Sequence, residues 1–288
     1  MRKAFAFSFE HDKFVHDFHL DKAISPATPD VKGLPYRDPN IKGISLDHEK
    51  ARAAFAAAKC GTAADAKPIT QTGFTFTIRY NTGGLERQAA AILFKAGVES
   101  YNSNFHVNVE GVPFAEFLNE IADGTLPGFV SGWFPDYIDD ADYIDQWMGS
   151  AAHGAVYSGP MSIDKLTEWG KAGTTPGGVS YATWDDLLNQ GISSIEPKVR
   201  RDIYSHLQKL YVDNAIGIPV SQATAYFIQR TWLDGWFYNP STTFPPLNLL
   251  SKKDDAKPNV EELCKNYPTT TFNFGGSPVV KKDCTNRP

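Results

Sequence analysis

The chain has 288 residues, of which 42% are hydrophobic and 21% charged, and its formal net charge at pH 7 is −5. A chain of this length can bury one large core or two modest ones, and the composition is that of a globular protein. The acidic balance argues against a nucleic-acid-binding protein, which needs a basic surface. No apolar run in the sequence approaches the length of a membrane span.

The N-terminal stretch predicts one amphipathic helix from about Lys3 to Phe18. The residues expected on its buried side are Phe5, Phe9, Phe14 and Phe18. Charged residues at 10–13 interrupt the apolar positions, so we expect no signal peptide here. The chain would then begin inside a helix without an N-terminal cap, which is unusual for a complete protein.

Three histidines in this stretch raise the question of a metal site. Of His11, His16 and His19, only the last two have the i, i+3 spacing that shares a helix face. No cysteine or further ligand pair is close by in the sequence, so we expect no metal.

A loop rich in proline and glycine follows at 25–43 and predicts a surface excursion or a lid-like connection. The next segment, LDHEKARAAFAAAK, predicts a helix that Asp47 caps.

From Gly73 the pattern changes to alternating strands and helices. The expected order is a strand at 74–80, a helix at 85–101, a strand at 105–112, a helix ending at Gly124, and a strand leading to 134. The residues expected on the buried side of the first of these helices are Leu85, Ala89, Ile92, Leu93 and Ala96. This β-α-β-α-β order implies an α/β fold with parallel strands and right-handed crossovers. Ligands of open sheets of this kind bind beyond the carboxyl ends of the strands.

The stretch 129–148, FVSGWFPDYIDDADYIDQWM, carries the candidate site. The apolar run from Phe129 to Phe134 predicts a buried strand, which Pro135 ends because it has no N–H to donate. An acidic turn follows, with carboxylates at Asp136, Asp139, Asp140, Asp142 and Asp145. A carboxylate at the mouth of a strand and beside aromatic rings suits a cation or an ammonium group. The alternative is a solvated acidic turn that caps the next helix.

The C-terminal part predicts helices at about 183–189 and 196–214, and then a strand-like run, IPVSQATAYFIQRT. The segment 251–288 is polar and is expected to be an appended tail. Within it, Cys264 and Cys284 would form a disulfide in an oxidising compartment or remain free thiols in a reducing one, and the sequence leaves both open.

The order of these motifs resembles the C-terminal part of family 5 solute-binding proteins, the oligopeptide, dipeptide and nickel receptors of ABC importers. The segments that carry the resemblance are RKAFAFSFEHDKFV, LDHEKARAAFAAAK, FTFTIRYNTGG, GWFPDYIDDADYIDQW and LYVDNAIGIPVSQATAYFI. The resemblance implies a periplasmic-binding-protein-like type II lobe, with a mixed sheet flanked by helices and with the family's N-terminal lobe missing. It divides the chain into a C-terminal lobe at 1–218, a return crossover toward the other lobe at 219–250, and the tail at 251–288.

The resemblance also implies a ligand site. Peptide-binding members hold an extended peptide between two lobes, and the Asp of their W-x-x-D-Y turn anchors the α-ammonium group. That residue matches Asp136, and Trp133, Phe134 and Tyr137 of the same motif are candidates to line the pocket. Packing against the sheet is the alternative for Trp133.

The expected function is therefore a binding component, without cofactor or enzymatic activity, for peptides or a similar small solute. Its partners would be an ABC permease on the outer side of a membrane and a separate chain that supplies the N-terminal lobe. The extracytoplasmic location follows from the resemblance alone. An inactive truncated receptor is a further alternative.

The other class to consider is a hydrolase that uses the 136–145 carboxylates as an acid–base pair. Against it, the carboxylates are contiguous in sequence, whereas acid and base usually come from different strand ends. A calcium loop is also disfavoured, because Ile138 and Ala141 occupy positions where its pattern needs a ligand and a glycine.

Overall fold

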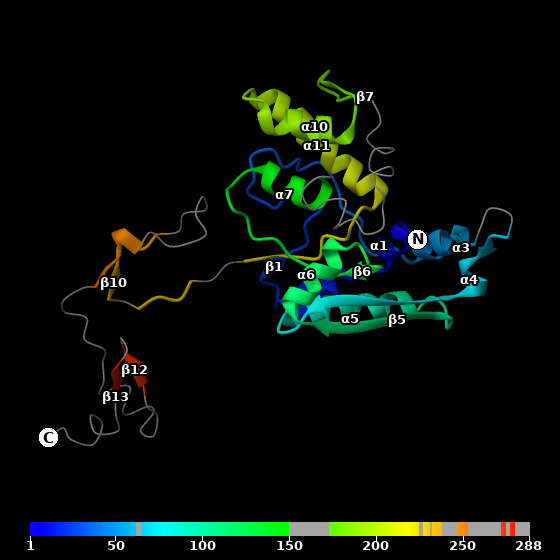
Figure 1. Ribbon diagram of the computed structural model, residues 1–288, viewed down its shortest axis with the longest axis horizontal. Coiled ribbons are helices and arrows are strands. Elements are labelled where there is room, and N and C mark those ends of the chain that lie inside the picture. The colour runs from blue at the N-terminus through cyan, green and yellow to red at the C-terminus, as the bar shows by residue number, and fades with distance from the viewer. Residues whose placement is uncertain are drawn as a thin grey trace. The chain divides into compact units, whose positions relative to one another are not determined.

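The computed structural model, drawn in Figure 1, describes residues 1–61, 65–149, 173–224, 227–230, 232–237, 247–252, 272–274 and 277–279. The chain divides into two compact units, Met1–Ala225 and Tyr226–Pro288. Cys264 and Cys284 lie outside the described residues, whereas Cys60 is an exposed free thiol.

The first unit combines helices with one parallel sheet and several short antiparallel pairs. Its described helices are α1 (Arg2–Ser8), α2 (His11–Asp17), α3 (His48–Ala57), α4 (Ile69–Thr72), α5 (Leu85–Glu99), α6 (Phe114–Ala122), α7 (Asp140–Met148), α10 (Trp184–Ser193) and α11 (Pro197–Asn214). Its described strands are β1 (Ala23–Ile24), β2 (Lys59–Cys60), β3 (Lys67–Pro68), β4 (Phe74–Asn81), β5 (Phe105–Val112), β6 (Gly128–Phe129), β7 (Gly173–Thr174), β8 (Ser180–Tyr181) and β9 (Gln222–Ala223). The antiparallel pairs are β1–β9, β2–β3 and β7–β8.

The second unit is described only in short pieces. These are β10 (Leu233–Asp234), β11 (Ser251–Lys252), β12 (Phe272–Phe274), β13 (Ser277–Val279) and the 3₁₀ turn η1 (Leu247–Leu249). β10 pairs with β11 and β12 with β13, both antiparallel.

The parallel sheet has the order β5-β4-β6, which confirms the predicted β-α-β-α-β organisation. Its two crossovers run in opposite directions, since the chain passes from β4 to β5 and then back beyond β4 to β6. Right-handed connections therefore place α5 and α6 on opposite faces. The hydrophobic core is accordingly divided into two clusters, one that includes α5 and one that includes α6. Ile78, Phe105 and Val107 pack with α1, α3 and α5, whereas Val112 packs with Phe117 of α6.

The predicted buried side of α5 is largely wrong, because Leu85 is 69% exposed and Ile92 is 52% exposed. The residues that α5 buries are Ala90, Ala91, Gly97 and Val98. The physical reason is the close approach of α1: a Cβ added to Gly97 would lie 2.4 Å from the carbonyl oxygen of Ser8. Small side chains, and not the large apolar ones, therefore define the packed face.

The single N-terminal helix is also a wrong prediction, since the chain breaks at Phe9, which has extended backbone angles. The spacing from Phe9 to Phe14 is five residues, which is off the helical repeat of three or four. Breaking the helix lets both rings enter one core with Ala90, and each is 2% exposed. Phe18, expected to be buried, is 38% exposed.

The three histidines of this stretch contact different partners. His11 Nε2 lies 3.2 Å from the carbonyl oxygen of Pro219, His16 contacts Asp21, and His19 contacts Glu86. Within the described residues, no group of three or more His, Cys, Asp or Glu is arranged to hold a metal ion.

Helices α7, α10 and α11 form a second body of the same unit, visible together in Figure 1. Their shared core includes Ile144, Trp184, Leu187, Tyr204 and Leu207, all at most 1% exposed. α11 runs from Pro197 to Asn214, close to the predicted range of 196–214, and it buries Ile203, Leu207 and Tyr211. None of the helices in the described part of the chain has the length and apolar character needed to cross a membrane.

The loop at 25–43 is not a surface excursion along its whole length, because Thr28, Asp30 and Leu34 are buried. It is fastened to α11 through Gln208, whose side chain accepts a hydrogen bond from the Asp38 amide and donates one to the Tyr36 carbonyl. The proline-rich composition predicted irregular backbone correctly, but it carries no sign of these contacts.

Replacing Gly97 tests the close α1–α5 contact. Gly97→Ala should destabilise the chain by about 1–3 kcal/mol because of overpacking, even though alanine is the better helix former by about 1 kcal/mol. Urea unfolding measures the difference, and Ile92→Ala on the exposed face is the control, with a change within about 0.5 kcal/mol. A Gly97→Ala variant as stable as the parent chain would contradict the packing described.

Candidate functional site

The candidate site is the turn that follows β6. The backbone N–H of Val130 donates to the Arg79 carbonyl at 2.9 Å, and after it the chain leaves the sheet toward α7. The predicted buried strand through Phe134 is therefore wrong: β6 ends at Phe129, and Phe134 is 82% exposed. The indole of Trp133 bonds to α7, so this part of the chain does not continue the sheet.

Asp142 in the first turn of α7 holds this loop. Its Oδ2 accepts a hydrogen bond from Trp133 Nε1 at 3.1 Å and another from the Asp136 backbone N–H at 3.0 Å. Burial raises the pKa of the Asp142 carboxyl, and these two donors oppose the rise. The two bonds fix the backbone on either side of Phe134 and Pro135, so the turn has a defined shape.

Asp139 joins the start of α7 to α11. Its Oδ1 caps the helix by accepting from the Ala141 amide at 2.8 Å, and it also pairs with Arg200 Nη2 at 2.5 Å. The Arg200 guanidinium lies 4.8 Å from the ring centroid of Tyr36 and 5.4 Å from that of Tyr204. The ion pair is mostly shielded, with side-chain exposures of 15% for Arg200 and 21% for Asp139.

Asp140 is fully buried at the same helix start. Its Oδ2 accepts a hydrogen bond from the Tyr36 backbone N–H at 3.1 Å, which links α7 to the loop at 25–43. Burial raises the pKa of the Asp140 carboxyl to about 6. Asp139, Asp140 and Asp142 are therefore all engaged with the protein itself.

Asp136 is the carboxylate of the turn that faces solvent. It is exposed, and no cation among the described residues pairs with it. Its neighbours Phe134 and Tyr137 are also exposed, at 82% and 52%. Burial raises the pKa of the Tyr137 phenol, and the Asp142, Asp139, Asp145 and Asp136 carboxylates add to the rise. The structure therefore brings the four predicted site residues into one turn, with Trp133 half-buried and the other three exposed.

Sequence reasoning did not find Asp142 and Arg200 as supports of this turn. Asp142 was seen only as one of several acidic residues, and its spacing from Trp133 gives no periodic signal. Arg200 lies 61 residues from its partner Asp139, so only the tertiary structure brings them together.

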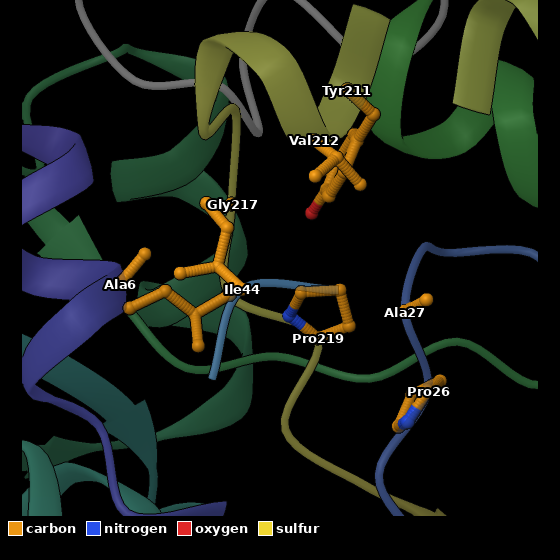
Figure 2. A pocket seen from close by; sticks show the side chains of 9 residues that line it. Ala6, Pro26, Ala27, Ile44, Tyr211, Val212, Gly217 and Pro219 are labelled. Carbon is orange, nitrogen blue, oxygen red and sulfur yellow. The ribbon is translucent and has the colours of Figure 1, made fainter. Parts of the chain in front are cut away.

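A hollow elsewhere in the first unit does not involve this turn. Figure 2 shows it between α1, the loop at 25–44 and the C-terminal end of α11. Its lining is mostly apolar, with the Tyr211 hydroxyl beside Gly217 as a polar group. The enclosed cavity volume is about 10 Å³, which is close to the smallest volume that holds one water molecule. Because it lacks convergent polar groups, the hollow is a poorer candidate than the Asp136 turn.

Comparison with known proteins assigns the chain to a family. The profile described as "Bacterial extracellular solute-binding proteins, family 5 Middle" matches residues 1–155. No curated protein matches the chain.

Among solved structures, similar folds include NikA from Brucella suis in complex with Fe(III)-EDTA, at 13% identity and a TM-score of 0.66, covering 88% of this chain and 47% of NikA. DppA from Helicobacter pylori in complex with the peptide STSA has 15% identity and a TM-score of 0.61, covering 88% of this chain and 44% of DppA. OppA from Listeria monocytogenes bound to peptide has 15% identity and a TM-score of 0.61, covering 87% of this chain and 44% of OppA. The chain thus spans a little under half the length of these three proteins. The α/β fold is that of a periplasmic-binding-protein lobe.

Removing the Asp142 carboxylate tests its role in holding the turn. Asp142→Ala leaves the Trp133 indole and the Asp136 amide without their acceptor, and the expected loss of stability is about 1–3 kcal/mol. Urea unfolding measures the loss, and an altered near-ultraviolet circular dichroism signal should report freed tryptophan.

The matched control is Asp213→Ala, which removes a carboxylate from an exposed pair with Lys209. That pair should contribute at most about 0.5 kcal/mol. Equal effects of the two substitutions would show that Asp142 has no special role.

Proposed function

The chain belongs to the family 5 bacterial extracellular solute-binding proteins, and from this premise we propose that it binds a peptide or similar small solute at the Asp136 turn. It would serve as part of the substrate-binding component of an ABC importer and deliver the solute to the membrane permease. The family is extracellular, so the proposed location is the periplasm or the cell surface.

The observation that carries the proposal is the exposed Asp136 carboxylate on a turn whose backbone is fixed. Two hydrogen bonds to Asp142 hold the turn in place, so a ligand would not have to order it. An ammonium group at Asp136 would form a charge-assisted hydrogen bond, which is stronger than a neutral one. Exposed rings at Phe134 and Tyr137 would add apolar and cation–π contact on either side.

These features favour a free α-amino group as the part of the ligand that this lobe recognises. DppA and OppA, which share the fold, were solved with peptides, whereas NikA was solved with Fe(III)-EDTA. The shared fold alone therefore does not identify the solute of this chain. For this chain we infer a peptide or another primary amine, because the exposed group of the turn is a carboxyl that pairs with no cation among the described residues.

The other side of the ligand would be covered by a second lobe. The chain spans under half the length of NikA and DppA, and an enclosed site needs contacts on both sides. We infer that this second lobe corresponds to the remaining length of those proteins, whether in a longer chain or in a separate one. Binding by this lobe alone would be weaker than binding by the pair.

A hydrolase that uses the 136–145 carboxylates is less well supported. Asp139 is engaged by Arg200, Asp140 is buried, and Asp142 holds the turn. These roles favour a binding turn over an acid–base pair, and the family is one of receptors.

The Asp136→Asn variant tests the ammonium site. Titration calorimetry with a pool of di- to pentapeptides should give saturable heat with the parent chain and at least about a tenfold weaker affinity with the variant, since a hydrogen bond to a charged group contributes about 1.5–3 kcal/mol. Asp213→Asn, which alters an exposed carboxylate on α11, should bind like the parent.

The ligand itself offers a second control. Nα-acetylated versions of the same peptides should bind the parent chain as weakly as the free peptides bind Asp136→Asn. Equal binding of free and acetylated peptides would refute an ammonium site at this turn, and peptide cleavage during the titration would favour the hydrolase.

A further inference from the structure

A second pair of acidic side chains lies behind the turn. Asp30, from the loop at 25–43, is completely buried, and its carboxyl group lies within hydrogen-bonding reach of the Asp140 carboxyl. Both oxygens of Asp30 and the Oδ1 of Asp140 are buried and accept no hydrogen bond from the residues that the structure describes. Thr28, two residues before Asp30, also buries a hydroxyl that has no hydrogen-bond partner in the described part of the chain. Two acids are thus in contact, and the facing oxygens of both lack a donor.

Both groups cannot carry a full negative charge in this position. Burial disfavours each ionised form, and two adjacent carboxylates repel each other. The charged and titratable groups facing Asp30 are Asp140, Arg37 and Asp139, and those facing Asp140 include Asp139, Arg200 and Tyr204. Arg200 already pairs with Asp139, and Arg37 forms no ion pair with either acid among the described residues. The local balance of charge remains negative unless a proton or a cation is added.

We propose that Asp30 and Asp140 share one proton, so that a protonated Asp30 donates a hydrogen bond to the Oδ1 of an ionised Asp140. One proton then supplies the missing donor and removes one of the two charges. A bound cation between the two carboxyl groups is less well supported than a proton. Among the described residues, no three or more Asp, Glu, His or Cys side chains are arranged to hold a metal ion. Paired acids that share one proton are a known outcome of such contacts.

The shared proton positions the binding turn. Asp140 is the first residue of α7, which follows directly on the turn at 136–139, and its other oxygen is bonded to Tyr36 of the loop. Loss of the proton would place two negative charges between the loop and α7 and push the two apart. The pair therefore makes the stability of this body, and the placement of Asp136, depend on pH.

The direction of the pH dependence follows from the raised pKa values. Burial, followed by the neighbouring Asp140 charge, raises the pKa of Asp30 well above its ordinary range, and burial raises the pKa of Asp140 to about 6. Above the ordinary carboxyl pKa of about 4, the folded chain holds a proton that the unfolded chain has lost. Stability therefore falls as the pH rises toward the folded pKa, with the folding equilibrium constant decreasing about tenfold per pH unit for one proton.

The test compares the parent chain with Asp30→Asn in urea unfolding from pH 5 to pH 8. The asparagine amide can donate the same hydrogen bond to Asp140 but carries no titrating proton. Between pH 5 and pH 8 the parent should lose about tenfold or more in its folding equilibrium constant relative to the variant. Asp213→Asn, at an exposed carboxylate, should keep the pH slope of the parent.

A spectroscopic readout covers the case in which Asp30→Asn does not fold. The infrared spectrum of the folded parent at pH 7 should contain the band of a buried protonated carboxylic acid, and the same band should disappear at high pH. The proposal is overturned if this band is absent, or if Asp30→Asn keeps the pH slope of the parent. It is also overturned if Ca²⁺ or Mg²⁺ stabilises the parent but not the variant, because a cation would then occupy the place of the proton. None of these measurements uses a solute, so they test the shared proton independently of the proposed function.

Discussion

The carboxylate of Asp142 is the contact on which the candidate site depends. It holds the Trp133 indole and the Asp136 amide at the same oxygen, so the segment between them must form a tight turn. This acceptor helps to fix the direction of a chain that leaves a strand of two residues. The side chain of Asp136 can then face solvent while its backbone remains fastened to α7.

The aspartates near the start of α7 have different roles, which depend on how deeply each one is buried. A helix start favours acidic residues, because its free N–H groups and dipole attract negative charge. Asp139 uses this position to cap the helix and to bind Arg200, whereas Asp140 is withdrawn from water beside Asp30. Asp136, before the helix, is exposed and pairs with no cation in the described ranges of the chain. The same residue type thus serves as a helix cap, as a buried acid and, at Asp136, as the exposed carboxyl that we propose binds the ligand.

Local sequence signals predicted the elements whose causes are local. Asp47 was read correctly as a cap, the strands at 74–81 and 105–112 follow their β-branched and aromatic pattern, and α11 follows its helical repeat. The role of the Asp136 turn as a ligand site stays a prediction, and the sequence did not reveal the contacts of Asp142 and Arg200 that support this turn. The failures share one physical reason, which is that a contact between distant segments decided the outcome.

Two examples make this reason concrete. The packed face of α5 is set by how closely α1 approaches Gly97, and a count of large apolar residues cannot reveal that distance. Asp30 stands in a proline-rich loop that looks exposed, and only the folded chain brings it against Asp140. Buried polar contacts between remote segments leave no periodic trace in the sequence.

The central claim is that the open carboxylate of this turn recognises an amino group. The most direct measurement follows the carboxyl carbon resonances of the aspartates in a ¹³C-labelled chain during titration with a free-amine peptide and with its acetylated form. The account predicts that the Asp136 resonance shifts with the free-amine peptide and stays in place with the acetylated one. A peptide that shifts other resonances while that of Asp136 stays unchanged would contradict it.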